Sequence, residues 1–197
     1  SRVYFAGGSG SEAVEAAMKL SYQVHHDNGR PERTWTISRN QSYHGATLGS
    51  LMASELNNLG FYEPLLPVNH ARIEQHHPLY YRRDDESLDD YARRSAQELE
   101  DKILEIGADK VSAFIGETML SAMVGDVPPA PGYWKYVREV CDRHGIHLIL
   151  DEVYCGLGRS GRSFCCEWDE ARPDFVTVGK TLAAGYVPLS AVITTDA

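Results

Sequence analysis

The chain has 197 residues, of which 43% are hydrophobic and 24% are charged, and its formal net charge at pH 7 is −9. These proportions are ordinary for a globular protein, and the negative charge argues against binding to nucleic acid or to anionic membranes. No apolar run approaches the roughly 18–20 residues that a membrane-spanning helix needs, so we expect no membrane partner.

The predicted secondary structure alternates between strand and helix. Strands are predicted at residues 2–6, 34–38, 111–116, 147–151, 174–178 and 190–195. Helices are predicted at residues 11–26, 45–54, 89–106 and 131–144. Such alternation predicts an α/β fold, with a mostly parallel sheet and helices on both faces. The segment 55–90 lacks clear periodicity, and we expect it to be a long surface excursion near the substrate entrance.

A glycine-rich turn follows the first predicted strand and leads into a strong helix-forming segment. At such a helix start, the backbone N–H groups of Gly10 and Ser11 and the helix dipole favour an anion such as phosphate. The glycine spacing matches neither a dinucleotide fingerprint nor a Walker motif. The alternative is a flexible turn that Ser9 or Ser11 caps.

Two aromatic or ionisable groups lie where other predicted strands end. Tyr43, followed by His44, comes after the strand 34–38 and could stack on a flat cofactor ring, although a core tyrosine fits equally well. Glu117 follows the strand 111–116.

Asp151 and Lys180 are the most informative pair, because each lies at the carboxyl end of a predicted strand, 29 residues apart. Ligands of open α/β sheets bind at that end. A carboxylate there can keep a pyridinium nitrogen protonated, and a lysine amine can form a Schiff base with a carbonyl. Taken singly, Asp151 could be a helix cap or a loop salt bridge, and Lys180 a solvated charge.

Together these segments resemble the class III aminotransferases, which are fold type I pyridoxal-phosphate enzymes. The resemblance is carried by GGSGSEAVEAAMKL at 7–20, SYHGATLGSL at 42–51, VPPAPGYWKYVREVCDRHGIHLILDEVYCGLGRSG at 127–161 and PDFVTVGKTLAAGYVPLSAV at 173–192. The stretch from about 55 to 110 matches only loosely.

The resemblance implies a site for pyridoxal 5'-phosphate. By that resemblance Lys180 forms the Schiff base and is catalytic, Asp151 holds the pyridine nitrogen, and the backbone at Gly10 and Ser11 binds the phosphate. Ser9 belongs to the same implied phosphate site.

Further cofactor contacts are implied for the ring. Tyr43 covers one face and Val153 presses on the other, while His44 and Glu117 complete the set, with Glu117 on the substrate side. The chain departs from the family at Tyr154, where many members have glutamine, and at Thr118, where many have proline. Both departures weaken any prediction of the substrate.

The implied reaction is ping-pong transfer of an amino group from an amine or amino acid to a keto acid. Alternatives on the same scaffold are an aminomutase, a racemase or a decarboxylase. An alternative of another class is a non-catalytic nucleotide- or phosphate-binding α/β module, which has no need of Lys180.

The resemblance also bears on organisation. We expect residues 1–197 to be the cofactor-binding large-domain core of a longer enzyme, with an N-terminal segment and a C-terminal small domain outside it. A homodimer with a shared active site is implied. Adjacent histidine pairs and four cysteines without a CxxC pair argue against a metal site and favour a reducing, cytoplasmic location, with a lost organellar targeting peptide as the alternative.

Overall fold

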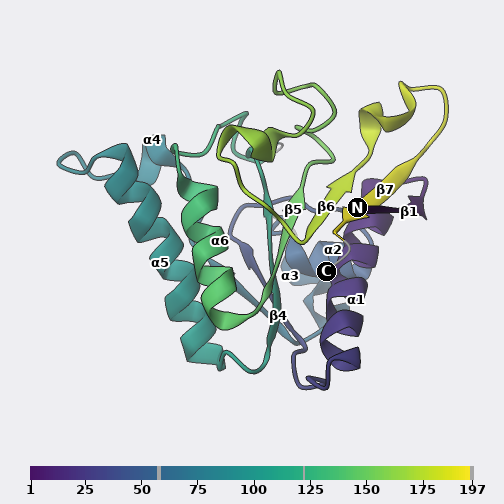
Figure 1. Ribbon diagram of the computed structural model, residues 1–197, viewed down its shortest axis with the longest axis horizontal. Helices are drawn as coiled ribbons and strands as arrows, with labels where there is room; N and C mark the ends of the chain where they lie inside the picture. Colours follow the sequence, from purple (N-terminus) through teal and green to yellow (C-terminus); the bar gives the residue numbers. More distant parts are fainter. Residues whose placement is uncertain (57–58, 122, 196–197) are drawn as a thin grey trace.

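A computed structural model describes residues 1–56, 59–121 and 123–195 (Figure 1). The strands are β1 (Arg2–Gly7), β2 (Trp35–Arg39), β3 (His70–Ile73), β4 (Val111–Glu117), β5 (His147–Asp151), β6 (Phe175–Val178) and β7 (Ser190–Thr194). The helices are α1 (Gly10–Asp27), α2 (Leu48–Ala53), α3 (Leu59–Tyr62), α4 (Pro78–Tyr81), α5 (Leu88–Ile106) and α6 (Tyr133–His144). Single 3-10 turns are η1 (Glu63–Leu65), η2 (Cys165–Trp168) and η3 (Lys180–Ala183). Within the described ranges, no helix is long and apolar enough to cross a membrane.

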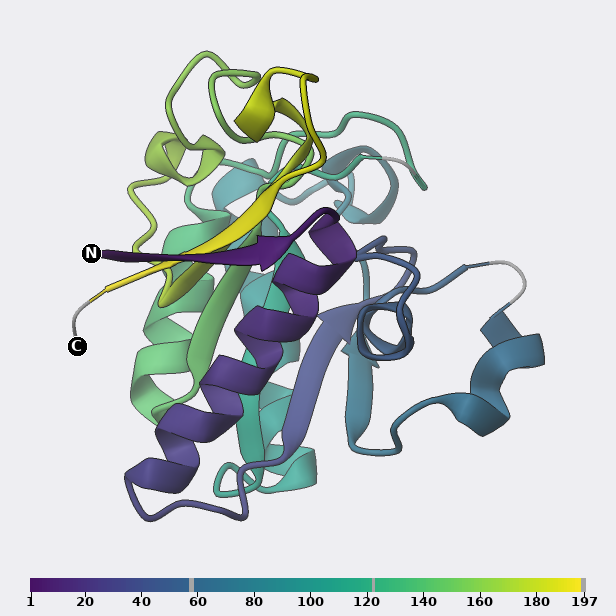
Figure 2. The ribbon, with the colours of Figure 1, turned by 90° about the vertical axis from the view of Figure 1, so that its right-hand side faces the viewer.

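The seven strands form one sheet in the order β1-β7-β6-β5-β4-β2-β3. Five neighbouring strands run parallel, in the sheet order β3, β2, β4, β5 and β6. The strand β7 is antiparallel to both of its neighbours, β6 and β1. Figure 2 shows β1 lying beside β7 and leading directly into α1. The prediction of a mostly parallel sheet is therefore confirmed.

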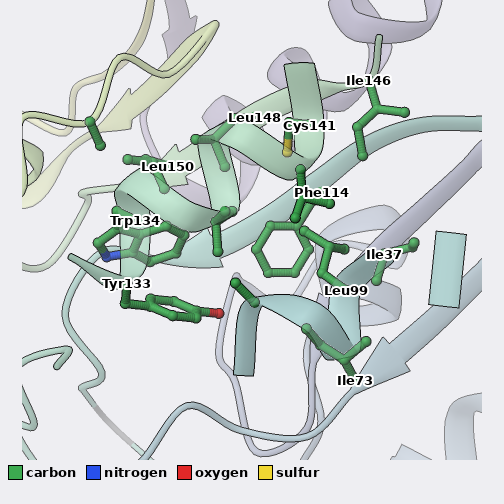
Figure 3. Close-up of a cluster of buried hydrophobic side chains, with 14 of the residues drawn as sticks. Ile37, Ile73, Leu99, Phe114, Tyr133, Trp134, Cys141, Ile146, Leu148 and Leu150 are labelled. Atoms are coloured by element: carbon green, nitrogen blue, oxygen red, sulfur yellow. The ribbon is translucent and has the colours of Figure 1, made fainter. Parts of the chain in front are cut away.

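Side-chain alternation along the central strands builds a core on each face of the sheet. Phe114 and Leu148 point toward α5 and α6 and pack with Trp134 (Figure 3). Their neighbour Ile149 points to the opposite face and packs with Val14 of α1. Successive strand residues face opposite sides, so these continuous apolar runs bury both faces of the sheet. Figure 1 shows the result, with α5 and α6 on one side of the sheet and α1 on the other.

The prediction that residues 55–90 form a surface excursion is wrong in one respect, because the segment contributes the edge strand β3. This strand pairs in parallel with β2. It has only four residues, two of them polar, so no hydrophobic period marks it. Asn57 and Asn58, in the same segment, lie outside the described residues.

The helix predicted at 45–54 is shorter than expected. α2 begins only at Leu48. Gly45 has φ 137°, a conformation outside the helical region, and it keeps the preceding segment extended. The chain thereby carries Tyr43 and His44 along the carboxyl edge of the sheet before the helix starts.

Candidate active site

Three adjacent strands deliver chemical groups to the same edge of the sheet. Glu117 is the last residue of β4, Asp151 is the last residue of β5, and Lys180 follows β6. They open onto a cavity with a volume of about 530 Å³. All of the predicted site residues line it: Ser9, Gly10, Ser11, Tyr43, His44, Glu117, Asp151, Val153 and Lys180.

Asp151 is buried, and hydrogen bonds fix its carboxylate. Oδ1 accepts from the backbone N–H of Val153 at 3.1 Å and from Thr177 Oγ1 at 3.0 Å. Oδ2 lies 2.8 Å from Nδ1 of His44, a buried ring whose Nε2 has no hydrogen-bond partner among the described residues. Three groups from three segments therefore hold one carboxylate at the cavity wall. No helix starts at Asp151, so the alternative role as a helix cap does not apply.

Lys180 is the first residue of η3, and its backbone is in the left-handed region, with φ 43°. Its Nζ lies 5.5 Å from the centre of the Tyr154 ring, which is cation–π distance. Among the described residues, no carboxylate forms an ion pair with this amine. The amine is therefore available to a ligand in the cavity.

The start of α1 is arranged as an anion site. Ser9 is the N-cap: its Oγ accepts from Glu12 N at 3.4 Å, and its own N–H donates to Glu12 Oε2 at 2.8 Å. The Ser9 hydroxyl also donates to this carboxylate and lowers the pKa of Glu12. Ser9 is thus occupied, whereas the backbone N–H groups of Gly10 and Ser11 donate no hydrogen bond within the described chain. They remain free for an anion at the positive end of the helix dipole.

Gly10 also sets how closely α1 approaches β5. A Cβ atom added at Gly10 would lie 2.7 Å from Cγ1 of Val153 and 3.0 Å from its Cγ2. Carbon atoms in contact normally lie 3.5–4.0 Å apart, so only glycine fits at this distance. The start of α1 therefore packs directly against Val153, two positions after Asp151.

Glu117 is buried and anchors the loop that carries Tyr43. Its Oε1 accepts from Tyr43 N at 2.9 Å, and its Oε2 accepts from Ser121 Oγ at 2.5 Å. The guanidinium of the buried Arg39 donates to the Glu117 carbonyl oxygen and lies 5.1 Å from the Trp134 ring centre. The sequence analysis did not find Arg39 or Ser121, and the one available signal was a charged residue ending a predicted strand.

Tyr154 lines the same cavity, next to Lys180. The neighbouring carboxyl of Asp126 raises the pKa of the Tyr154 phenol. The guanidinium carbon of Arg159 lies 5.8 Å from the centre of its ring. The residue that departs from the family pattern thus has a defined environment at the site.

These groups match what pyridoxal phosphate requires of its site. Two free amides suit a phosphate, a fixed buried carboxylate suits a protonated ring nitrogen, and an unpaired amine suits an aldehyde. The volume of the cavity lies in the range of small-molecule pockets, roughly 300–1,000 Å³.

Comparisons with known proteins agree with this geometry. The sequence model of the family described as aminotransferase class-III matches residues 1–197. The chain is 38% identical to uncharacterized aminotransferase C1771.03c of Schizosaccharomyces pombe, covering 98% of this chain and 42% of that protein. It is 37% identical to diaminobutyrate–2-oxoglutarate transaminase of Halomonas elongata, covering 100% of this chain and 42% of that protein.

Solved structures give the same result for the fold. The chain superposes on an omega-aminotransferase from Paracoccus denitrificans with a TM-score of 0.90 at 32% identity, covering 98% of this chain and 42% of that one. A PLP-bound aminotransferase mutant from Vibrio fluvialis gives a TM-score of 0.90 at 32% identity, covering 99% of this chain and 42% of that one. The chain spans about 42% of the length of these relatives.

Proposed function

Because the chain belongs to the class III aminotransferase family and has the fold of the type I pyridoxal-phosphate enzymes, we propose that it forms the cofactor-binding core of a pyridoxal-phosphate-dependent aminotransferase. The observation that carries this proposal is the arrangement around one cavity of an unpaired lysine amine, a fixed buried carboxylate and two free helix-terminal amides.

Lys180 has two roles in the proposed reaction. Its Nζ would hold the cofactor covalently. When it does not hold the cofactor, the same Nζ would accept a proton from the amine-bearing carbon of the donor and later return one, as a general base and acid. When bound, pyridoxal phosphate supplies a ring that withdraws electrons from the bond being broken.

Asp151 provides the negative charge that keeps the ring nitrogen protonated. His44, Thr177 and the backbone of Val153 prevent the carboxylate from turning away, so its charge needs no reorganisation during turnover. The amides of Gly10 and Ser11 bind the phosphate. These residues therefore hold the two ends of the cofactor, which fixes the reacting carbon relative to Lys180.

The proposed substrates are an amine or amino acid as donor and a keto acid as acceptor. Relatives named diaminobutyrate–2-oxoglutarate transaminase and taurine–pyruvate aminotransferase support this general class, and they differ from one another in both partners. Of the two departures from the family pattern, Tyr154 lines the cavity, whereas Thr118 is buried and its hydroxyl donates to Glu152 Oε1. The proposal therefore covers the class of donor and not an individual donor.

The assembly and location are also proposals. We propose a homodimer with a shared active site, with further domains beyond this core, in the cytoplasm. Val3, Tyr4 and Phe5 on β1 are each more than half exposed, and such apolar surface at a sheet edge is suited to being covered. Light scattering of the full-length protein measures its molar mass in solution and so tests the proposed dimer. A monomeric mass at working concentration would reject the dimer.

Borohydride trapping tests the central proposal. The full-length protein, saturated with pyridoxal phosphate and reduced, should carry the cofactor mass on the peptide that contains Lys180. Lys180→Ala should abolish the label and lower turnover by several orders of magnitude, while Lys135→Ala, a surface control, should do neither. A label on another lysine would refute the assignment.

The alternatives give different results in the same preparation. A racemase or decarboxylase would carry the label on Lys180 but would release no keto acid from the donor. A non-catalytic phosphate-binding module would carry no label at all. Keto-acid formation that depends on both the donor and the acceptor distinguishes the aminotransferase from both.

A further inference from the structure

The loop after β5 contains three buried cysteines for which the proposed function has no use. Cys155, Cys165 and Cys166 all lie between Asp151 and the end of η2, and the structure shows them as free thiols. This segment also supplies Tyr154 to the candidate active site. Three buried thiols so close to the site call for a chemical explanation.

The backbone of this loop folds back on itself. Leu157 N donates to Ser163 O at 2.9 Å, and Gly158 N donates to Arg162 O at 3.1 Å. In each bond the two residues lie the same number of positions before and after Ser160, at the tip of the loop. Cys155 and Cys165 come two positions further out on the two arms, so the fold brings them together.

Glu152 keeps the two arms closed. Its Oε2 accepts from Cys165 N at 2.7 Å, and its Oε1 accepts from Cys166 N at 2.8 Å. Its carbonyl oxygen accepts from Gly156 N at 2.9 Å, on the other arm. One buried residue therefore ties the backbone next to Cys155 to the backbone of Cys165.

The two facing thiols are chemically unequal. The hydrogen bond from the Cys155 thiol lowers the pKa of Cys165, and the same contact raises the pKa of Cys155. Cys165 is thus the more acidic of the two and the better nucleophile near neutral pH. Cys165 also lines a cavity of about 440 Å³, together with Pro128 and Trp168, whereas Cys155 and Cys166 are not among the residues that line it.

We propose that Cys155 and Cys165 are a redox modification site that forms a reversible intrachain disulfide. The oxidant is a low-molecular-weight disulfide such as oxidised glutathione. The Cys165 thiolate attacks one sulfur of the oxidant and expels a thiolate. The Cys155 thiol loses its proton and attacks the Cys165 sulfur, which expels the second thiolate. Two protein thiols are oxidised, and one oxidant disulfide is reduced to two thiols.

Cys166 is the matched control for this pair. It is also buried and is adjacent in sequence to Cys165. Burial and the neighbouring Glu152 carboxylate raise the pKa of its thiol, so it is the poorer nucleophile. If proximity in the sequence or general oxidation were enough, Cys166 would react as readily as Cys165.

Peptide mapping of the full-length protein tests the proposal. The folded protein is treated with oxidised glutathione and is then unfolded in the presence of N-ethylmaleimide, so that buried free thiols are blocked as they become exposed. The blocked protein is digested with trypsin. Cleavage after Arg159 and Arg162, both exposed, separates the two cysteines. We expect the peptides 144–159 and 163–180 to be linked, and the link to disappear on reduction.

The variants identify the sulfurs involved. Cys166→Ser should retain the linked peptides, whereas Cys155→Ser and Cys165→Ser should reduce them to background. Fragmentation of the wild-type linked pair assigns the bond independently of any variant, so a variant that fails to fold leaves the test intact. A bond through Cys166, or linked peptides that form only after unfolding, would overturn the proposal.

Discussion

Gly10→Ala is the most direct test of how the anion site is built. The added Cβ would lie 2.7 Å from Val153 Cγ1, well inside carbon contact distance. The helix start or Val153 must therefore move, and both line the cavity. We expect the variant to lose stability and to bind pyridoxal phosphate more weakly, because the free amides of residues 10 and 11 move with the helix.

The size of the effect follows from two opposing contributions. Overpacking of this kind costs about 1–3 kcal/mol. Alanine favours a helix over glycine by up to about 1 kcal/mol, and that gain is smaller at a helix start. The net loss in the free energy of unfolding is therefore about 1–2 kcal/mol. If the displaced amides lose a similar amount in binding, the cofactor Kd rises by roughly tenfold for each 1.4 kcal/mol.

A double-mutant cycle checks the cause. Val153→Ala removes both methyl groups that the new Cβ would meet, so Gly10→Ala should cost little stability in that background. Gly8→Ala is the matched control, since its Cβ meets only Pro188 Cβ, at 3.2 Å. Urea unfolding measures the free energy of unfolding, and cofactor titration measures the Kd for pyridoxal phosphate. Equal loss in both backgrounds, or a stable Gly10→Ala with wild-type affinity, would refute the close-approach explanation.

Two further predictions concern ionisation. Asp151→Asn should bind pyridoxal phosphate yet turn over far more slowly than wild type, and Asp151→Glu should retain more activity than Asp151→Asn. Assays of keto-acid formation measure both. If Asp151→Asn were as active as wild type, the role of Asp151 would be structural only. Burial lowers the pKa of His76 to about 2, whereas an unfolded histidine titrates near pH 6.5. Below pH about 6.5 the unfolded chain therefore binds a proton that folded His76 does not, and stability present above that pH falls by up to about 1.4 kcal/mol per pH unit. Urea unfolding at pH 7 and pH 5 should show a smaller fall for His76→Gln, and no such reduction for the exposed control His26→Gln.

Much of the fold could be predicted because its signals are local. The strands β4, β5 and β6 are mainly apolar. Glu117 and Asp151 are the last residues of β4 and β5, and Lys180 lies two positions after the end of β6. Parallel strands bring their carboxyl ends to one edge, which is why these three residues line the same cavity. The strand β3 was missed because an edge strand of four residues, two of them polar, leaves no period to detect.

The supporting contacts of the site could not be predicted, because they join residues that are far apart in the sequence. His44 and Asp151 are 107 positions apart, and Arg39 and Glu117 are 78 apart. No local pattern specifies such pairs, since they depend on which strands become neighbours. The pairing of Ser9 with Glu12 is local. The sequence placed Ser9 either at the phosphate or at a helix cap, and the structure shows the cap; the return bond from the Ser9 N–H to Glu12, which completes the capping box, was not predicted.

The backbone of Lys180 places a restriction on how this protein can evolve. A non-glycine residue with φ 43° carries a conformational cost of about 1–2 kcal/mol, which glycine would not carry. Under the proposed function, the need for the amine keeps lysine at this position despite the cost. In a lineage that no longer uses the amine, replacement by glycine would be favoured on stability alone. A glycine at this position in a related sequence would therefore identify a protein that has kept the fold and lost the chemistry.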